Sequence, residues 1–326
     1  MNLKRFNTFA TMVTEADSRN TMSVVIPVKD RSHLICRCLD SVRSQTWRPI
    51  KIILVDNGSS DDTVEVAERW RASNSEPGLS MVILHEPQPG AACARNRGLS
   101  NVDTEYVMFF DSDDTMRPGL VETAMTYFLK SPEVDIVYWR GCVNHANGHK
   151  SLTKFNVSNQ WRYHIYHALL RTLGYAVRSE FIRRVGGWNS KLSCWDDWEL
   201  GVRLLLGNPG MNSIDETLVD IYPQKKSITG ENFFSKSGEW EKAVDAAEKA
   251  VEASSFKDLA WLIQLINYRR VNLAALYRHE GRKDLAEPLL EKALRHGSLN
   301  KLDKIRLRLI YLYTGLGMRG GYMFWK

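Results

Sequence analysis

Val107-Met108-Phe109-Phe110-Asp111-Ser112-Asp113-Asp114 is a run of apolar residues followed at once by a run of acids. A short apolar run bounded by breakers is typical of a buried strand that is covered on both faces. Each of the three carboxylates would lose much of its hydration free energy if it were buried without a partner. We therefore expect a strand that ends near residue 110, with carboxylates beyond its end that face water or a cation.

The three acids have two interpretations. Carboxylate oxygens at this spacing suit Mg²⁺ or Mn²⁺, which often take one or two protein carboxylates and fill their other positions with substrate phosphates. Alternatively, the acids form a turn before a helix that starts near Pro118, with Asp114 or Thr115 as its N-cap. The neighbouring segments decide between a metal site and a turn.

Three apolar runs rich in β-branched residues precede this stretch, and each predicts a strand. They span residues 23–28, 50–55 and 81–84. A helix is expected after each of them. Strands that alternate with helices predict an α/β fold with a mostly parallel, doubly wound sheet flanked by helices. Further strands are expected at 134–139 and 176–178, on either side of a hairpin or loop.

Polar loops follow three of the predicted strands, at residues 29–31, 56–62 and 111–114. In an open parallel sheet, ligands bind in the crevice beyond the carboxyl ends of the strands. We therefore expect these loops to converge on one crevice. Their convergence favours a binding site over three unrelated turns.

Four segments resemble, in order and spacing, the motifs of the family 2 inverting glycosyltransferases. They read S-V-V-I-P-V from Ser23, L-V-D-N-G-S-S-D-D-T from Leu54, A-R-N-R-G from Ala94 and F-D-S-D-D from Phe110. The resemblance covers residues 22–225 and implies a GT-A fold, the fold of nucleotide-diphospho-sugar transferases. We place this domain at residues 22–230, after an N-terminal arm of residues 1–21.

The resemblance implies roles for residues on the donor side of the site. Pro27 and Asp30 line the base and ribose side of the pocket, and Asp56 hydrogen-bonds the nucleobase. Arg95 lies near the diphosphate, where a guanidinium suits phosphate geometry. Many members carry Tyr-Asn where this chain has Lys29-Asp30. The residues alone also fit a turn-stabilising role for Asp56 and a surface charge for Arg95.

Asp111 and Asp113 match the Asp-x-Asp pair of the family, with Ser112 between them. The resemblance implies that one of the two acids reaches the ribose and that both lie near a Mn²⁺ or Mg²⁺ ion. Asp111 and Ser112 are therefore counted among the nucleotide-sugar-binding residues. Asp111 and Asp113 are the expected metal ligands.

Ser193-Cys194-Trp195-Asp196-Asp197-Trp198-Glu199-Leu200 resembles the Glu-Asp motif of the family, with Asp196 where Glu is usual. Inversion at an anomeric carbon needs a base that takes the proton of the acceptor hydroxyl. We assign this role to Asp197, with Asp196 as the second catalytic candidate and with Trp195 and Trp198 as acceptor-binding residues. Alternatively, one of the two acids caps the helix that we expect at residues 200–206.

Residues 231–326 carry a different pattern, which predicts an α-helical C-terminal region. Tyr277 and Tyr311 are 34 residues apart, as are Gly281 and Gly315, and the segment between them resembles a tetratricopeptide repeat. Fewer than three full repeats should not be stable alone. We therefore expect these helices to pack on the catalytic domain, on another protein or on a second copy.

Composition sets further limits. The chain has 326 residues, and its whole net charge of +6 lies in residues 236–326. This surplus suits a peripheral membrane or protein contact, or a solvated helical surface, whereas no motif supports nucleic-acid binding.

Five cysteines without a CxxC pair predict free thiols. No apolar run is long enough to span a bilayer, and we expect a cytoplasmic protein, either free or peripheral on the inner face of the membrane.

The predicted function is inverting transfer of a sugar to a hydroxyl of a saccharide or lipid-linked saccharide acceptor, in cell-surface polysaccharide synthesis. A UDP-hexose is the expected donor. The alternative is a catalytically inactive sugar-nucleotide-binding platform that uses its helical tail for protein interaction. A nucleotidyltransferase is disfavoured because residues 27–32 lack the glycine-rich loop that such an enzyme needs.

Overall fold

The computed structural model describes residues 20–153, 158–224, 232–297, 299–318 and 320–325. The chain divides into two compact units. The first contains residues up to 155, 170–191 and 209–222, and the second contains 156–169, 192–208 and 223–326. Three segments of the predicted catalytic domain, 156–169, 192–208 and 223–230, therefore belong to the second unit. The predicted boundary at residue 230 stays a prediction, and most of the predicted N-terminal arm lies outside the described residues.

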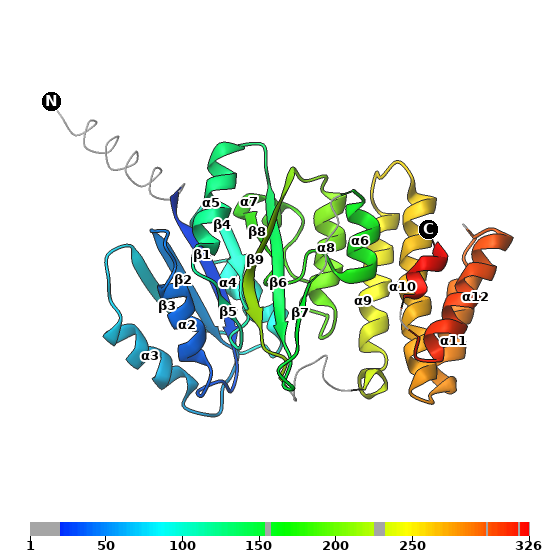
Figure 1. The fold of residues 1–326 in the computed structure, drawn as a ribbon, viewed down its shortest axis with the longest axis horizontal. Coiled ribbons are helices and arrows are strands. Elements are labelled where there is room, and N and C mark those ends of the chain that lie inside the picture. Colours follow the sequence, from blue (N-terminus) through cyan, green and yellow to red (C-terminus); the bar gives the residue numbers. More distant parts are fainter. Residues whose placement is uncertain (1–19, 154–157, 225–231, 298, 319, 326) are drawn as a thin grey trace. The chain divides into compact units, whose positions relative to one another are not determined.

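Four parallel strands form one half of the sheet in the first unit, in the order β3-β2-β1-β4 (Figure 1). They are β1 (Met22–Val28), β2 (Ile50–Asp56), β3 (Leu79–His85) and β4 (Tyr106–Phe109). Their registers pair Val28 with Asp56 and Asp56 with His85 at the carboxyl ends. The predicted strands are thus confirmed, and the loops that follow them leave from one edge of the sheet.

The other half of the sheet is mixed, which limits the predicted parallel arrangement to the first four strands. The order continues β4-β8-β6-β9-β5, with β8 (Tyr175–Arg178) antiparallel to both β4 and β6 (Ile136–Asn144). A hairpin joins β6 to β7 (Lys150–Leu152), as expected for this region. The long strand β9 (Met211–Ile221) runs parallel to β6.

The alternative in which Asp114 or Thr115 caps a helix is wrong. Thr115 and Met116 form β5 (Thr115–Met116), which pairs with β9, and helix α5 (Leu120–Lys130) begins only after Gly119. Asp114 instead accepts a hydrogen bond from the backbone N–H of Tyr222 at 2.7 Å. The acidic run therefore lies between two strands, where a second segment of the chain holds it.

Helices cover the parallel half of the sheet. They are α2 (Ile35–Arg43), α3 (Thr63–Ser73) and α4 (Ala91–Leu99), and a short helix, α7 (Ser179–Arg184), follows β8. Helix α4 packs closely on β1, because a Cβ atom at Gly98 would lie 2.3 Å from a methyl carbon of Val25. The strand residues at the centre of this layer, among them Val24, Ile52 and Met108, are buried in one hydrophobic core.

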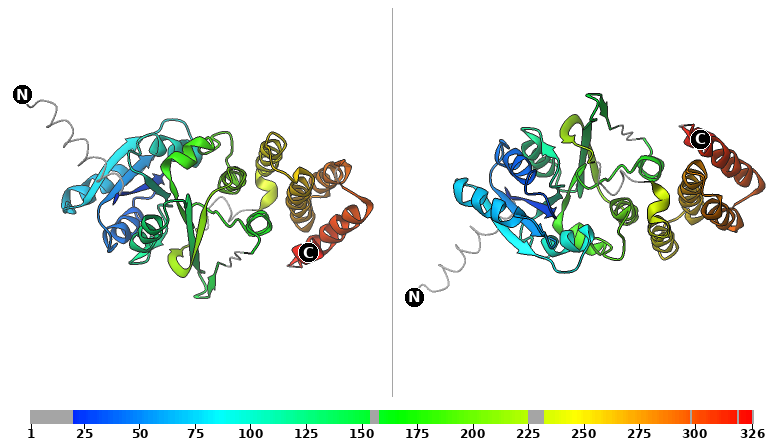
Figure 2. Two further views of the ribbon diagram at one scale, coloured as in Figure 1. Left: turned by 90° about the horizontal axis from the view of Figure 1, so that it is seen from above. Right: turned by 90° about the horizontal axis from the view of Figure 1, so that it is seen from below.

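The second unit is helical, as predicted for the C-terminal region. Its elements are α6 (Gln160–His167), α8 (Asp196–Leu206), η1 (Phe233–Lys236), α9 (Glu239–Glu252), α10 (Leu259–His279), α11 (Lys283–Arg295), α12 (Lys301–Gly315) and η2 (Gly321–Trp325). Helix α10 packs against α9, α11 and α12 (Figure 2). Tyr277 and Tyr311, the pair 34 residues apart, are both buried in this unit. No helix in the described part of the chain is long and apolar enough to cross a membrane.

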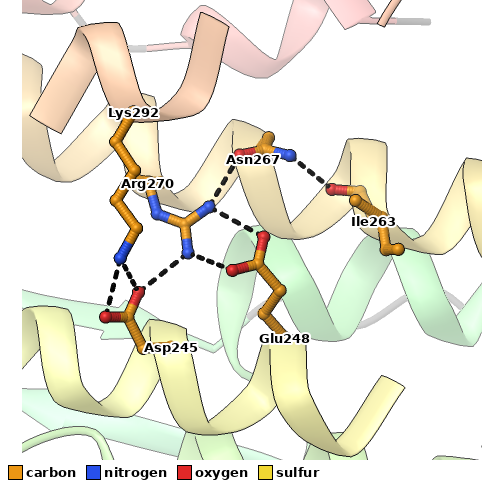
Figure 3. Close-up of polar contacts among 6 residues, drawn as sticks. All are labelled: Asp245, Glu248, Ile263, Asn267, Arg270 and Lys292. Atoms are coloured by element: carbon orange, nitrogen blue, oxygen red, sulfur yellow. Dashed lines mark hydrogen bonds and ion pairs between the residues drawn. The ribbon is translucent and has the colours of Figure 1, made fainter. Parts of the chain in front are cut away.

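A buried arginine joins three helices of this unit (Figure 3). The guanidinium of Arg270 on α10 donates to Asp245 at 2.9 Å and to Glu248 at 2.8 and 3.0 Å, both on α9. Lys292 on α11 donates to Asp245 at 2.7 Å, and the side chain of Asn267 accepts from Arg270. Since a buried charge is costly without partners, this network favours one arrangement of the three helices over others.

Candidate active site

Asp56, the last residue of β2, closes its own loop and also contacts the end of β3. Its carboxylate accepts from the backbone N–H groups of Gly58 at 3.2 Å and Ser59 at 3.1 Å. Nδ1 of His85 lies 3.1 Å from the same carboxylate. The turn-stabilising interpretation of Asp56 is therefore observed. His85 was missed by the sequence reasoning, although its place directly at the end of the third strand was a usable signal.

Asp30 links the loop after β1 to the loop after β2. Its backbone is left-handed, with φ of 51°, and its carboxylate accepts from the N–H of Ser60 at 2.7 Å and from its hydroxyl at 3.0 Å. These hydrogen bonds hold the pKa of Asp30 below its ordinary value. Pro27 is buried inside β1, paired with Val55 of β2.

Asn57 fixes the loops after β2 and β3 and the start of α4. Its side-chain amide donates to the carbonyls of Glu86 at 2.9 Å and Gln88 at 2.6 Å, and its side-chain oxygen accepts from the N–H of Gly90 at 2.8 Å. Gly90 is the N-cap of α4, which carries Arg95. These bonds join the loop after β2 to the loop after β3. Of the three loops predicted to converge, 29–31 and 56–62 are connected by the hydrogen bonds from Ser60 to Asp30.

Arg95 is held against the acidic run and is not a surface charge. Its guanidinium lies 2.9 Å from the carboxylate of Asp111 and 4.4 Å from the ring centre of Trp188. Only 6% of the residue is exposed. Asn96, the next residue of α4, accepts from the N–H of Trp188 at 2.9 Å and donates to its carbonyl. Trp188 therefore supports the plane in which the guanidinium lies.

The acids at 113 and 114 are crowded and partly withdrawn from water. The carboxylate of Asp113 is 3.9 Å from the guanidinium of Arg31, and Arg37 donates to the backbone carbonyl of Asp113. Burial, with the nearby charge of Asp111, raises the pKa of Asp113. Burial and the same charge raise the pKa of Asp114 to about 8. Ser112, between Asp111 and Asp113 in the chain, is buried.

The carboxylate oxygens here fit a divalent cation that takes its remaining coordinating atoms from a bound small molecule. Within the described ranges, no three His, Cys, Asp or Glu side chains gather in a way that would hold a metal alone. Mg²⁺ and Mn²⁺ sites of the phosphate-binding type need only one or two protein carboxylates. The crowding that raises the pKa of Asp113 would be relieved by a cation, so the chemistry of the Asp111 and Asp113 carboxylates suits such an ion.

Two further residues belong to this site because the fold brings them to it, although they lie in no sequence motif. Arg37 on α2 lies over the ring of Tyr222, with its guanidinium carbon 4.2 Å from the ring centre. The backbone N–H of Tyr222 binds Asp114. Arg37 and Tyr222 lie outside the sequence motifs that follow β1, β2 and β4. Tyr222 comes directly after β9, a strand that no sequence pattern predicted. No signal in the sequence pointed to either one.

The second predicted acidic motif lies in the second unit, at the start of α8. Trp195 is the N-cap residue, with left-handed φ of 52°, and Asp196 and Asp197 are in the first turn. The helix therefore begins at the acids and not at residue 200. Acids in a first turn interact favourably with the helix dipole. The alternative in which one of the two acids is the N-cap is therefore wrong, because Trp195 occupies that position. The catalytic roles of Asp196 and Asp197 stay a prediction.

Aromatic side chains and one cation surround this motif. Trp198 is fully buried, and Trp195 packs against Trp240 of α9, with ring centres 5.1 Å apart. The guanidinium carbon of Arg269, on α10, lies 3.8 Å from the ring centre of Trp195 and 5.3 Å from that of Trp198. Burial lowers the pKa of Arg269 to about 10, against the opposing attraction of Asp197. Arg269 was not predicted.

The backbone after Trp198 is fixed by a core histidine. Nε2 of His164, on α6, lies 2.8 Å from the carbonyl oxygen of Trp198, and His164 is fully buried. Gly201 makes this approach possible, since a Cβ atom there would lie 2.1 Å from the imidazole of His164. His164 therefore positions the first turn of α8.

Residues 23–186, half of the chain, match the family described as Glycosyl transferase family 2. The chain is similar to the uncharacterized glycosyltransferase YibD of Escherichia coli, with 36% identity over 114 residues, which are 35% of this chain and 32% of that protein. The chain spans about a third or less of the length of the first curated relatives that it matches.

Two solved structures are similar in fold. TarS of S. aureus in complex with UDP-GlcNAc has a TM-score of 0.70 and 15% identity, over 90% of this chain and 86% of that chain. The mannosyltransferase PcManGT of Pyrobaculum calidifontis, in complex with GDP-Man and Mn²⁺, has a TM-score of 0.53 and 17% identity, over 94% and 82%. Together with the family match, these structures confirm the predicted GT-A fold and C-terminal helical region.

Proposed function

Because the chain belongs to glycosyl transferase family 2, we propose that it transfers a sugar from a nucleotide-diphospho-sugar to a hydroxyl group, with inversion at the anomeric carbon. A UDP-hexose is the first donor to test, since TarS, which is similar in fold, was solved with UDP-GlcNAc. The acceptor class is a saccharide or lipid-linked saccharide of a cell-surface polysaccharide.

The contact between Arg95 and Asp111 is the observation that carries the donor assignment. A buried guanidinium, stacked on Trp188 and 2.9 Å from a carboxylate at the end of β4, is poised to exchange that partner for a diphosphate. Arginine suits this exchange because its planar fork binds carboxylate and phosphate oxygens in the same geometry. Asp56 and Asp30 then present oxygens to the base and ribose from the adjacent strand ends.

The proposal includes a metal requirement. Asp111 and Asp113 would hold a Mn²⁺ or Mg²⁺ ion, which when bound supplies Lewis-acid stabilisation to the departing nucleoside diphosphate. Arg31 and Arg95, the cations that face these two acids in the protein alone, would then be free to contact phosphate oxygens.

Asp197 is the proposed base. Its role is to take the proton of the acceptor hydroxyl while that oxygen attacks the anomeric carbon. Trp195, which is partly exposed, is proposed to order the acceptor side, where apolar sugar faces pack on aromatic rings. Trp198 is fully buried, so the predicted acceptor contact of Trp198 is replaced by a supporting role behind Trp195, with ring centres 6.0 Å apart. Arg269, whose guanidinium lies over the ring of Trp195 and is attracted to Asp197, is proposed to orient that carboxylate.

The test is a donor panel in which release of nucleoside diphosphate is measured with candidate acceptors. The Asp197→Asn variant should lose a factor of about 10² to 10⁴ in turnover, the range of general base catalysis, while nucleotide binding is kept. The Asp215→Asn variant removes a carboxylate that is 75% exposed on β9 and should behave as wild type. Full activity in Asp197→Asn would refute the base assignment, and donor binding without any turnover would favour the platform alternative.

A further inference from the structure

One face of the helix α12 is apolar and exposed. Its residues recur with spacings of three and four, so they form a single stripe along the helix. The stripe consists of Leu302, Ile305, Leu309, Leu312 and Leu316, between 45% and 69% exposed. The opposite face of the same helix, with Leu307 and Ile310, is buried in the core of the second unit. The helix is therefore apolar on two sides, and among the residues that the structure describes only one of these sides is covered by packing.

The last described residues extend this exposed apolar surface. Met323 is 51% exposed and Phe324 is 37% exposed, both in η2. The ring of Phe324 packs edge-on against Tyr313 of α12, with ring centres 5.2 Å apart. An exposed apolar surface built from neighbouring residues commonly marks a contact with a protein or a membrane.

Cations line both sides of the stripe. By helical periodicity, Lys301 and Arg308 flank one side and Arg306 flanks the other. The single acid of α12, Asp303, is buried and completes the cap at Asn300, with which it exchanges hydrogen bonds of 2.9 and 3.1 Å. Asp303 also pairs with Arg306, at 4.0 Å. The exposed residues of the described helix are therefore leucine and isoleucine side chains together with Lys301 and Arg308.

This charge pattern decides between the possible occupants. Two copies of the stripe packed together would bring the same cations face to face, and like charges at flanking positions oppose helix pairing. At an anionic bilayer, by contrast, the apolar residues enter the acyl boundary while the long basic side chains extend to the phosphates. We propose that this stripe of α12, with Met323 and Phe324, docks the protein in the plane of an anionic lipid surface.

The proposal does not rest on the transferase activity. Its test is flotation of the 326-residue chain with vesicles of phosphatidylcholine alone and vesicles in which about a third of the lipid is phosphatidylglycerol. We expect flotation with the anionic vesicles, weakened by salt, because exposed charges are screened. Absence of flotation with the anionic vesicles would overturn the proposal, as would equal flotation with neutral ones.

Matched variants locate the surface. The double variant Ile305→Gln, Leu309→Gln should reduce vesicle binding about tenfold or more, since it makes the apolar stripe polar. Leu129→Gln removes a leucine on α5 that is 45% exposed, as Leu309 is, and should change nothing. Both stripe residues are exposed, so unfolding temperatures should stay near wild type. Unchanged flotation of the double variant would overturn the assignment to α12.

Charge variants test whether the basic residues beside the stripe contribute to vesicle binding. Lys301→Gln with Arg308→Gln should weaken binding to anionic vesicles several-fold, whereas Lys257→Gln with Arg295→Gln removes two exposed cations outside α12 and should not. Light scattering in solution tests the other possible occupant of the stripe, a second copy of this chain. A dimer that the Ile305→Gln, Leu309→Gln variant dissociates, without vesicle binding in the wild type, would assign the stripe to a second copy instead.

Discussion

At the scale of single residues, the acids beyond the strands were predictable and their partners were not. Asp56, Asp111 and Asp113 stand out because an acid directly after an apolar strand needs an explanation. His85 reaches Asp56, and Tyr222 reaches Asp114, only because the sheet brings distant segments together. Asp56 is observed to stabilise its own turn, and its binding role stays a proposal.

Arg95→Lys tests the geometry of the proposed diphosphate contact. Lysine keeps the charge but loses the planar fork and the stacking on Trp188, so we expect the KM for the donor to rise about tenfold. Steady-state kinetics with a fixed acceptor measures this. Arg97→Lys, an exposed position on the same helix, is the matched control. Equal KM values in the two variants would mean that Arg95 does not contact the donor.

Asp220 predicts a pH dependence of stability. Hydrogen bonds from Arg117, at 2.8 and 2.9 Å, hold the pKa of Asp220 below its ordinary value. A depressed folded-state pKa adds stability above the unfolded-state pKa of about 4, and this is lost as pH falls through the folded-state pKa. Asp220→Asn should therefore cost about 1 kcal/mol of unfolding free energy at neutral pH, because the pair is partly exposed.

Unfolding at several pH values separates the contribution of the Asp220 charge from a simple loss of packing. Urea unfolding of wild type and Asp220→Asn between pH 7 and pH 3 should show a gap that narrows below about pH 4. A gap of constant size at every pH would show that the charge of Asp220 contributes nothing.

At the scale of elements, local pattern predicted the strands of the parallel half and most helices, and failed where tertiary pairing decides. Strand β9 contains Asn212, Asp215, Glu216 and Asp220 among its apolar residues, so no apolar run or strict alternation marks it. It is a strand because β6 and β5 pair with its two sides. Helix α8 was predicted too short, because its first turn consists of acids and tryptophans that read as a loop.

Arg270→Met tests whether the buried network holds α9, α10 and α11 together. The variant leaves Glu248 without its arginine, and breaking a buried ion pair by removing one partner costs about 3 kcal/mol. Urea unfolding at neutral pH measures the loss. Arg295→Met breaks a pair with Glu291 whose side chains are 80% and 62% exposed, and should have little effect. Similar losses in both variants would exclude a special role for the network.

At the scale of the whole molecule, the two acidic motifs of the sequence fall in different compact units. Asp111 and Asp113 belong to the sheet unit, and Asp197 belongs to the helical unit that also contains the C-terminal helices. The sequence pattern treated the second motif as part of the first domain, because chain order alone does not show which segments pack together. The charge surplus of the last quarter was visible in the sequence, whereas its arrangement around the stripe of α12 required the structure.

The central claim is that the edge of the sheet at Asp111 and Asp113 binds a nucleotide sugar together with a divalent cation. The most direct test is the unfolding temperature with UDP, GDP and their sugar derivatives, each with Mn²⁺, Mg²⁺ or EDTA. A ligand that binds only the folded state raises this temperature by mass action. We predict a rise with one nucleotide that needs the metal and is lost in Asp113→Asn but kept in Asp215→Asn. No rise with any nucleotide, or an equal rise in Asp113→Asn, would contradict the account.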